Sequence, residues 1–204
     1  MKKVNLKTPE EIKIMAEGGA KLRRVRHALM AKIAAGVSAW DIEELADRLI
    51  KEAGAVPSFK MVPGYSWATC VNANDGIVHG IPKKEMIFKD GDVVSVDVGF
   101  FYKGFHTDTS DTVLVGHDPE KSRFLECGRR ALKEAIGQAK PGKRISDISR
   151  AIESTITSGG FSPIRTLVGH GVGRELHEAP AVPCFVGKKS QEDVVREVVA
   201  QIKT

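Results

Sequence analysis

Two aspartates stand in a stretch that otherwise has the residue pattern of a buried sheet. Asp97 lies between two valines, and Asp108 lies in a second strand-like run that follows a short polar break. If Tyr102 and Lys103 form a two-residue turn, Asp97 faces Asp108 directly on one side of the hairpin. Two carboxylates held this close on a partly dry face repel, so one takes up a proton or both share a cation. The hairpin therefore predicts an acid pair or a metal site.

A different turn, or one acid facing solvent, would make these carboxylates structural instead, because strand register is weakly specified by sequence. Asp111 shares neither the pairing nor the face of Asp108 in this register. We expect Asp111 to be a solvated residue.

Three histidines stand in contexts that suit a metal or substrate site. Glycines flank His170 in "GHGVGRELHEAP", His177 follows in the same segment, and "IVHGIP" places His79 before a glycine. A single histidine is more often a packed imidazole than a ligand. Together with two facing aspartates, however, they make a carboxylate and imidazole site for a divalent ion plausible. The other three histidines have no such context: His27, His106 and His117.

Helix start and stop signals divide the rest of the chain. Thr8 and Glu11 form a capping box before a helix that Gly36 ends, and Ser38 begins a second helix that stops at Gly54. Strands are expected near 67–72, 93–101 and 105–115, and further helices at 119–139 and 146–158.

The two helical blocks share residues at one offset, which predicts a duplication. The matched pairs are Gly36 with Gly142, Asp41 with Asp147, Ile42 with Ile148, Ile50 with Ile156, Gly54 with Gly160 and Pro57 with Pro163. After Pro57 the first block continues through both aspartate strands, whereas the chain ends before the second block could repeat them. Residues 190–202 have a helical stripe of valines, with a strand "VVREVV" as the alternative.

Composition places the chain among ordinary globular proteins. It has 204 residues, a net charge of +5 and three cysteines without CxxC spacing, so we expect a reducing compartment and no thiolate zinc. The basic run "KLRRVR" (21–26) falls in a helical pattern and is expected to be a solvated face rather than a nucleic-acid patch. Without a signal or a long apolar run, the cytoplasm is the expected location and no membrane partner is expected.

Three segments carry a resemblance to a known family. "NANDGIVHGIP", "GDVVSVDVGFFYKGFHTDTS" and "GHGVGRELHEAP" occur in the order and spacing of the type I methionine aminopeptidases, which the chain resembles to about residue 188. The resemblance implies an α+β pita-bread fold of pseudo-twofold duplicated α/β halves with an antiparallel sheet. The expected domain covers residues 1–204, with a first half of about 1–115 and an incomplete second half of about 116–204.

The resemblance also implies roles for single residues. Asp97, Asp108 and His170 would be metal ligands for two divalent ions, drawn from Co²⁺, Mn²⁺, Fe²⁺ and Zn²⁺. Both His79 and His177 would act in catalysis and substrate binding, His79 on the substrate backbone and His177 on the developing oxyanion. The methionine side-chain pocket would be lined by Phe59, Tyr65, Cys70 and Leu176.

The implied reaction is metal-assisted removal of the N-terminal methionine from nascent proteins. The expected partners are therefore peptides that begin with methionine, and the ribosome is a candidate partner. No specific nucleic acid is expected, and an exposed core would favour self-association.

The chain departs from the family pattern at two ligands. Members carry two further glutamates on later strands, and their motifs are not found here, since Glu178, Glu192 and Glu197 lie in other contexts. This predicts a C-terminally truncated member of the family with impaired activity. Such a chain would hold two metal ions, one ion or none. The alternatives are an inactive fragment, a non-catalytic protein-binding module of the same fold, and an X-Pro peptidase.

Overall fold

The computed structural model describes residues 4–187. These residues form two compact units. The N-terminal unit consists of residues 13–122 and 172–176, and the C-terminal unit of residues 4–12, 123–171 and 177–187. The predicted helix or strand at 190–202 lies outside the described residues, and the expected single duplicated domain stays a prediction.

The four long helices lie where the start and stop signals predicted them. They are α1 (Pro9–Lys32), α2 (Ala39–Glu52), α3 (Pro119–Gln138) and α4 (Ile145–Ser158). The hydroxyl of Thr8 accepts a bond from the Glu11 amide, and the Glu11 carboxylate accepts one from the Thr8 amide. Ser38 and Asp41 make the same reciprocal pair at α2. Each capping box satisfies amides that the first helical turn leaves without a helical partner.

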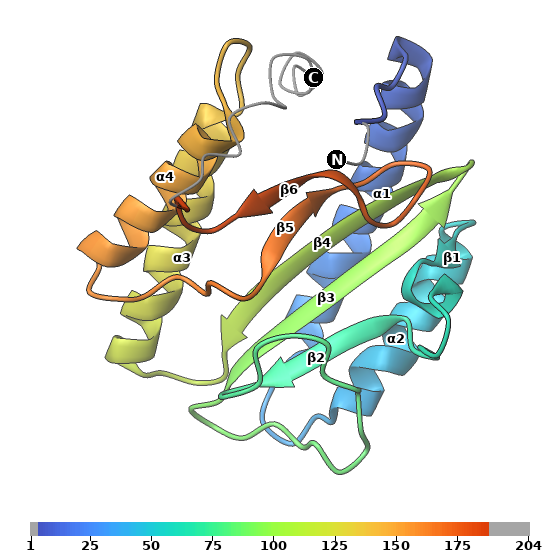
Figure 1. Ribbon diagram of the computed structural model, residues 1–204. Coiled ribbons are helices and arrows are strands. Elements are labelled where there is room, and N and C mark those ends of the chain that lie inside the picture. Colours follow the sequence, from blue (N-terminus) through green and yellow to red (C-terminus); the bar gives the residue numbers. More distant parts are fainter. Residues whose placement is uncertain (1–3, 188–204) are drawn as a thin grey trace. The chain divides into compact units, whose positions relative to one another are not determined.

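The N-terminal unit is built around an antiparallel sheet with helices on one side (Figure 1). Its strands are β1 (Val56–Pro57), β2 (Thr69–Ala73), β3 (Val93–Tyr102) and β4 (Phe105–Leu114), with β3 paired to the other three. Alternate residues of β3 point toward α1 and α2 and form the core, namely Val94, Val96, Val98 and Phe100. The intervening residues, Asp97 among them, face away from the helices because side chains alternate along a strand.

The register of the β3–β4 hairpin differs from the one we expected. The turn is Lys103–Gly104, both residues with positive φ, so Asp97 pairs with Ser110 and Asp108 pairs with Gly99. A turn with two positive φ values suits the right-handed twist of a hairpin, and glycine takes one of them without strain. The expected direct pairing of Asp97 with Asp108 is therefore wrong. The two acids are diagonal neighbours on one face.

The C-terminal unit contains a short two-stranded sheet packed on helices. β5 (Val168–Gly171) pairs with β6 (Glu178–Pro183), with an irregularity after His170. Ala135 of α3 packs with Ile145 and Ile148 of α4, and Val182 of β6 packs against this cluster. The mixture of helices and antiparallel sheets confirms the expected α+β composition.

The two helical blocks repeat each other in structure as well as in sequence. Gly36 and Gly142 have φ values of +86° and +85°, and the helices that follow are both 14 residues long. Asp147 accepts a bond from the Arg144 amide at 2.9 Å, as Asp41 does from the Ser38 amide at 2.8 Å. These two pairs of positions therefore serve the same local purposes in both blocks.

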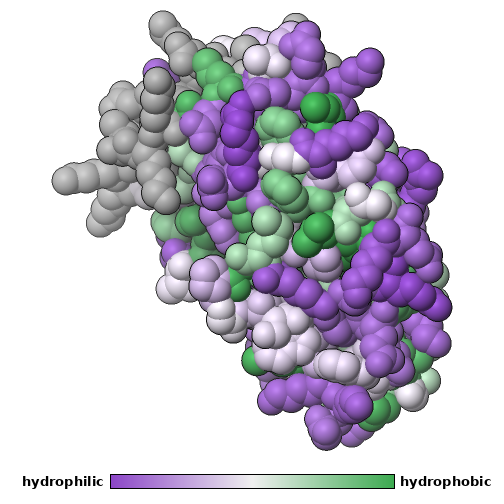
Figure 2. Space-filling model, turned by 90° about the vertical axis from the view of Figure 1, so that its right-hand side faces the viewer, coloured by the Kyte–Doolittle hydropathy of each residue, from purple (hydrophilic) through white to green (hydrophobic). Residues whose placement is uncertain are grey.

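The basic run on α1 is a solvated face, as expected. Arg23 and Arg24 are exposed, whereas Leu22, Val25 and Leu29 are buried against the sheet. The face of the molecule seen in Figure 2 is mainly hydrophilic, with hydrophobic side chains in small groups among the polar ones. None of the helices in the described part of the chain has the length and apolar character that a membrane crossing requires.

Candidate metal centre and substrate site

Asp97 and Asp108 lie on the face of the sheet that carries no helix. Asp97 pairs with Ser110 and Asp108 with Gly99, two residues along the same strands, so both side chains point the same way. Both acids are half-buried. Asp111, by contrast, pairs with Val96 on the helix side and lies 3.8 Å from the Nε atom of Arg26. The expected solvated role for Asp111 is therefore wrong, because it is half-buried and ion-paired.

The pKa of Asp97 is raised well above its usual range. Burial is the largest cause, followed by the charge of Asp108 and a hydrogen bond with Asp108 that favours the protonated form. The two carboxyl groups therefore act as one coupled pair that resists a double negative charge. This is the electrostatic situation that a bound cation relieves.

The donor chemistry of the pair fits a divalent ion. Two carboxylates provide oxygen ligands, and a cation near both would replace their repulsion with attraction. The Cβ atom of an alanine at position 99 would lie 3.4 Å from Oδ1 of Asp108 and 3.1 Å from the ring of Phe59. Gly99 therefore keeps the space beside Asp108 open.

Four residues that the resemblance assigned to the methionine pocket form one hydrophobic cluster. Phe59, Cys70 and Leu176 are each less than a tenth exposed, and Tyr65 packs against them. The rings of Phe59 and Tyr65 meet edge to face with centroids 6.4 Å apart. We call these four residues the Tyr65 cluster. Leu176 is far from the other three residues in sequence. Its segment, residues 172–176, nevertheless belongs to the N-terminal unit.

The polar groups of the Tyr65 cluster stay neutral near physiological pH. Burial raises the pKa of the Cys70 thiol to about 11, although its hydrogen bond with Tyr65 works in the opposite direction. Burial, with the same hydrogen bond, also raises the pKa of Tyr65. A protonated thiol and a neutral phenol suit an uncharged, polarisable ligand.

The Tyr65 cluster and the two aspartates share one face of the same sheet. Cys70 of β2 pairs directly with Asp97 of β3, and directly paired residues of an antiparallel sheet point to the same side. An apolar surface and a coupled carboxyl pair therefore meet at the Cys70–Asp97 position. This adjacency lies wholly within the N-terminal unit.

His79 lies on an exposed loop that a glycine holds against β2. Its φ is +56°, and the following residue Gly80 accepts a hydrogen bond from the Val71 amide at 2.8 Å. A Cβ atom at Gly80 would come within 2.1 Å of the Val71 carbonyl oxygen, so only glycine permits this contact. The exposed imidazole of His79 is thus held beside β2, the strand that carries Cys70.

His170 and His177 face each other across the β5–β6 hairpin of the C-terminal unit. Their ring centroids are 4.4 Å apart. Nδ1 of His170 donates to the Gly171 carbonyl oxygen at 3.0 Å, since a carbonyl can only accept. This bond sets the tautomer and leaves the lone pair on Nε2, as in histidines that bind metals.

The predicted site residues therefore fall into two groups, one in each unit. The N-terminal unit holds Asp97, Asp108, His79 and the Tyr65 cluster, and the C-terminal unit holds His170 and His177. Within either unit alone, the described residues contain no cluster of three or more His, Cys, Asp or Glu side chains suited to a metal ion.

Two buried polar residues near the site were missed by the sequence reasoning. His106, expected to have no role, is buried and shares a 2.8 Å hydrogen bond with Ser58, and its amide donates to the Gly173 carbonyl at 2.7 Å. Glu43 is buried on α2. The signal for Glu43 was a charged residue on the apolar face of a helix, since Ala39 and Ala46 lie on the same side.

Comparison with known families gives a match over most of the chain. The model of metallopeptidase family M24 matches residues 13–200. The chain is 40% identical over 180 residues to methionine aminopeptidase 1 of Bacillus subtilis (strain 168), covering 88% of this chain and 72% of the relative. It is 39% identical over 197 residues to a methionine aminopeptidase of Aquifex aeolicus (strain VF5), covering 92% and 76%.

Solved structures agree with the sequence comparison. The crystal structure of methionine aminopeptidase from Thermotoga maritima matches with a TM-score of 0.91 and 41% identity, over 96% of this chain and 78% of that chain. A prolidase from Pyrococcus furiosus matches with a TM-score of 0.77 and 28% identity, over 88% and 52%. The pita-bread fold class expected from the sequence is therefore confirmed.

The family match covers more than half of the chain and agrees with the coupled carboxyl pair, the adjacent apolar cluster and the facing histidines. Members of a metallopeptidase family are hydrolases that use a metal ion. By sequence and by structure, this chain belongs to metallopeptidase family M24.

Proposed function

We propose that the chain is a metal-dependent aminopeptidase that removes methionine from the N-terminus of newly made proteins. The observation that carries this proposal is the direct pairing of Cys70 with Asp97, which puts the Tyr65 cluster beside the carboxyl pair on one sheet face. A side chain held by the cluster would place the adjoining peptide bond near the carboxylates. The named relatives support methionine as that side chain.

Asp97, Asp108 and His170 are the proposed metal ligands, for one or two ions such as Mn²⁺, Fe²⁺, Co²⁺ or Zn²⁺. When bound, such ions act as Lewis acids toward the scissile carbonyl and toward water. The aspartates contribute negative charge, and His170 contributes an imidazole nitrogen, the donor type that divalent transition metals favour.

The Tyr65 cluster is the proposed receptor for the methionine side chain. Phe59 and Tyr65 offer ring edges and Cys70 a polarisable thiol, and all three suit a thioether better than a charged or branched polar group. A neutral Cys70 also avoids adding a third negative charge beside Asp97 and Asp108.

The two exposed histidines are proposed to bind the reacting part of the substrate. His79 would donate a hydrogen bond to the peptide backbone, and His177 would stabilise the negative charge that develops on the carbonyl oxygen. Their exposure leaves both imidazoles accessible to a peptide.

We propose further that this 204-residue chain binds metal weakly and has low activity. Asp97 and Asp108 together supply two negative charges, whereas two divalent ions carry four positive charges. With His170 as the only further ligand proposed, we expect weak metal binding and slow turnover. We further propose that it acts in the cytoplasm on chains leaving the ribosome, and that exposed core favours self-association.

Metal titration with matched variants tests the proposed ligands. Calorimetry with Mn²⁺ should show binding by the parent chain and a loss of at least tenfold in affinity for Asp97→Asn, Asp108→Asn and His170→Ala. Asp111→Asn is the matched control, because that carboxylate lies on the helix side of the sheet and should leave Mn²⁺ affinity unchanged. Equal affinity of the parent and Asp97→Asn would refute the site.

Peptide cleavage in Mn²⁺ tests the reaction. The tripeptide Met-Ala-Ser should release methionine slowly, and Leu-Ala-Ser should be cleaved more slowly still. Cleavage of Ala-Pro in preference to Met-Ala-Ser would instead identify an X-Pro peptidase. Metal binding without any cleavage would favour the binding-module alternative.

A further inference from the structure

Glu43 carries a charge into the apolar face of α2. It is 4% exposed and shares its helix face with the buried Ala39, Ala46 and Ile50. A buried carboxylate is costly unless hydrogen bonds or an opposite charge compensate it. The hydrogen bonds and ion pair of Glu43 therefore indicate the role of this buried carboxylate.

Both carboxylate oxygens of Glu43 bind the backbone at the start of β2. Oε1 accepts from the Ala68 amide at 2.7 Å, and Oε2 accepts from the Thr69 amide at 3.0 Å and from the Thr69 hydroxyl at 2.7 Å. Lys60 lies 3.9 Å from Oε1 and also binds Asp47 at 2.6 Å. Three donors on two consecutive residues therefore hold residues 68 and 69 against α2.

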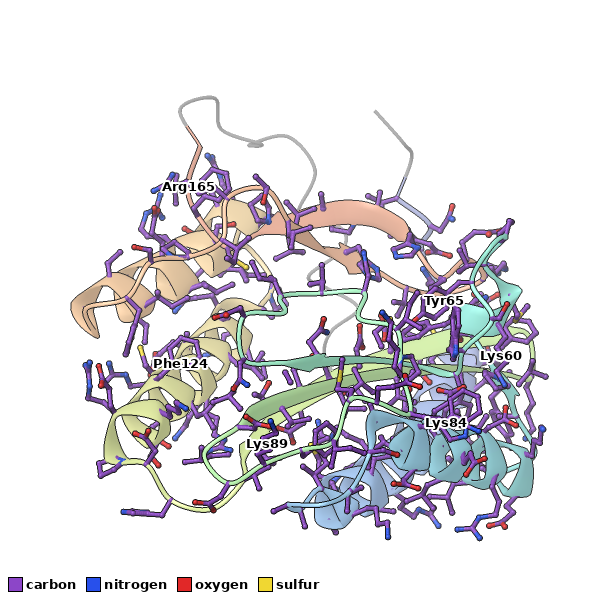
Figure 3. All side chains as sticks on the ribbon, turned by 90° about the horizontal axis from the view of Figure 1, so that it is seen from below. Lys60, Tyr65, Lys84, Lys89, Phe124 and Arg165 are labelled. Atoms are coloured by element: carbon purple, nitrogen blue, oxygen red, sulfur yellow. The ribbon has the colours of Figure 1, made fainter. Side chains whose placement is uncertain are left out.

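Ala68 and Thr69 precede Cys70 in the chain, and Thr69 also binds Tyr65. The Tyr65 hydroxyl lies 2.8 Å from the Thr69 carbonyl oxygen, to which it donates, and 3.2 Å from the Cys70 sulfur. Figure 3 shows Lys60 and Tyr65 at the same end of the sheet. A chain of hydrogen bonds thus runs from Glu43 through Thr69 to the two polar members of the Tyr65 cluster.

We infer that Glu43 is a positioning residue for the substrate side-chain site: it sets the place of Cys70 and Tyr65 by fixing the backbone of Ala68 and Thr69. This inference rests on the proposed function, because the Tyr65 cluster is the proposed methionine receptor. A purely structural role would attach α2 to the sheet without affecting what the cluster binds. A conservative substitution of Glu43 separates the two roles. It changes what the Tyr65 cluster binds if Glu43 is a positioning residue, and it leaves that binding unchanged if the role is structural.

The central variant is Glu43→Gln, which keeps the shape but places an NH₂ group against backbone donors. Its matched control is Glu44→Gln, the same change on the next residue, which is exposed to solvent. Thr69→Val is a second, milder variant that removes the hydroxyl donor and leaves both amide bonds. It keeps the test informative if Glu43→Gln does not fold.

Thiol labelling reports the position of Cys70 without any substrate. The described residues include three free cysteines, and Cys127 is buried in the C-terminal unit, so its labelling reports unfolding of that unit. Iodoacetamide modification, followed for each cysteine by mass spectrometry, should be about tenfold faster at Cys70 in Glu43→Gln and unchanged at Cys127. Thr69→Val should show a smaller increase, and Glu44→Gln should match the parent.

Calorimetry with L-methionine and with Mn²⁺ completes the test. We expect the affinity for L-methionine to fall about tenfold in Glu43→Gln, as a lost bond to a charged group implies, with Mn²⁺ affinity unchanged. Unchanged Cys70 labelling, equal acceleration at Cys127, or unaltered L-methionine affinity would each overturn the inference. If the parent chain binds no L-methionine but Cys70 labelling responds as expected, the proposed function fails while the positioning by Glu43 stands.

Discussion

Asp97 and Asp108 are two acids that the fold brings together at a cost to stability. Their carboxyl groups point from neighbouring strands to the same face, where burial and mutual repulsion raise the pKa of Asp97. A structural role would not need two acids in this position, because the other face of β3 is a continuous row of apolar residues. The repulsion supports the proposal that the pair binds a cation.

The raised pKa of Asp97 predicts how stability depends on pH in the metal-free chain. The unfolded chain releases this proton near its ordinary pKa of about 4, whereas the folded chain keeps it to a higher pH. The folded state therefore binds more protons in this window, so the contribution of Asp97 to stability is largest below about pH 4 and is lost as the pH rises through the raised pKa. Asp97→Asn should flatten this fall and be more stable than the parent at pH 8 by about 1–2 kcal/mol.

Urea unfolding in EDTA between pH 5 and pH 8 measures this effect. Mn²⁺ should reverse the order, since the ion stabilises only the chain that keeps both ligands. A parent chain that gains stability between pH 5 and pH 8 relative to Asp97→Asn would contradict the coupling.

At the scale of elements, the turn at Lys103–Gly104 decides which residues of β3 and β4 pair. Both residues have positive φ, at 48° and 90°. The turn we expected lay one residue earlier, which displaces the pairing by two positions. Because side chains alternate with a period of two, this displacement keeps Asp97 and Asp108 on one face and changes only their spacing.

Gly104 should therefore be costly to replace. An alanine there would meet no atom within 4 Å, so the cost of Gly104→Ala comes from the positive φ alone, about 1–2 kcal/mol. Gly128 in α3 also has open space around its Cβ position but has no positive φ, so Gly128→Ala should stabilise the chain by about 0.5–1 kcal/mol. Chemical denaturation measures both changes, and a stabilising Gly104→Ala would show that the turn differs from the one described.

At the scale of the whole molecule, each unit is assembled from segments that are distant in sequence. The C-terminal unit includes residues before α1 as well as β5 and β6. Lys7 forms a buried ion pair with Glu178, the residue next to His177, and their side chains are 10% and 2% exposed. The segment before α1 therefore takes part in holding the strand that follows His177.

The variant Lys7→Met tests how much the ion pair with Glu178 contributes to the free energy of unfolding. The change leaves the Glu178 charge buried without its lysine partner and should lower the free energy of unfolding by about 3 kcal/mol. The double variant Lys7→Met with Glu178→Leu should recover much of the loss, because no charge is then buried. Lys103→Met removes an exposed pair with Glu17 and serves as the control, with no measurable change expected in urea midpoint. Equal stability of Lys7→Met and the parent would show that the pair is dispensable.

The sequence alone determined the features that depend on neighbouring residues. Capping residues such as Thr8 and Ser38 located the helices, alternation located β3 and β4, and the parity of that alternation put Asp97 and Asp108 on one face. These signals are local, because a cap or an alternating pattern acts within a few residues.

Only the tertiary structure decided how distant residues combine. The pairing of Asp97 with Ser110, the ion pair of Asp111 with Arg26, and the bonds of Glu43 to Thr69 join residues that no local pattern connects. Asp111 was expected to be a solvated acid, since a charge in a sequence does not reveal its partner. Burial and long-range hydrogen bonding, which set the cost and the use of a charge, exist only once the chain has folded.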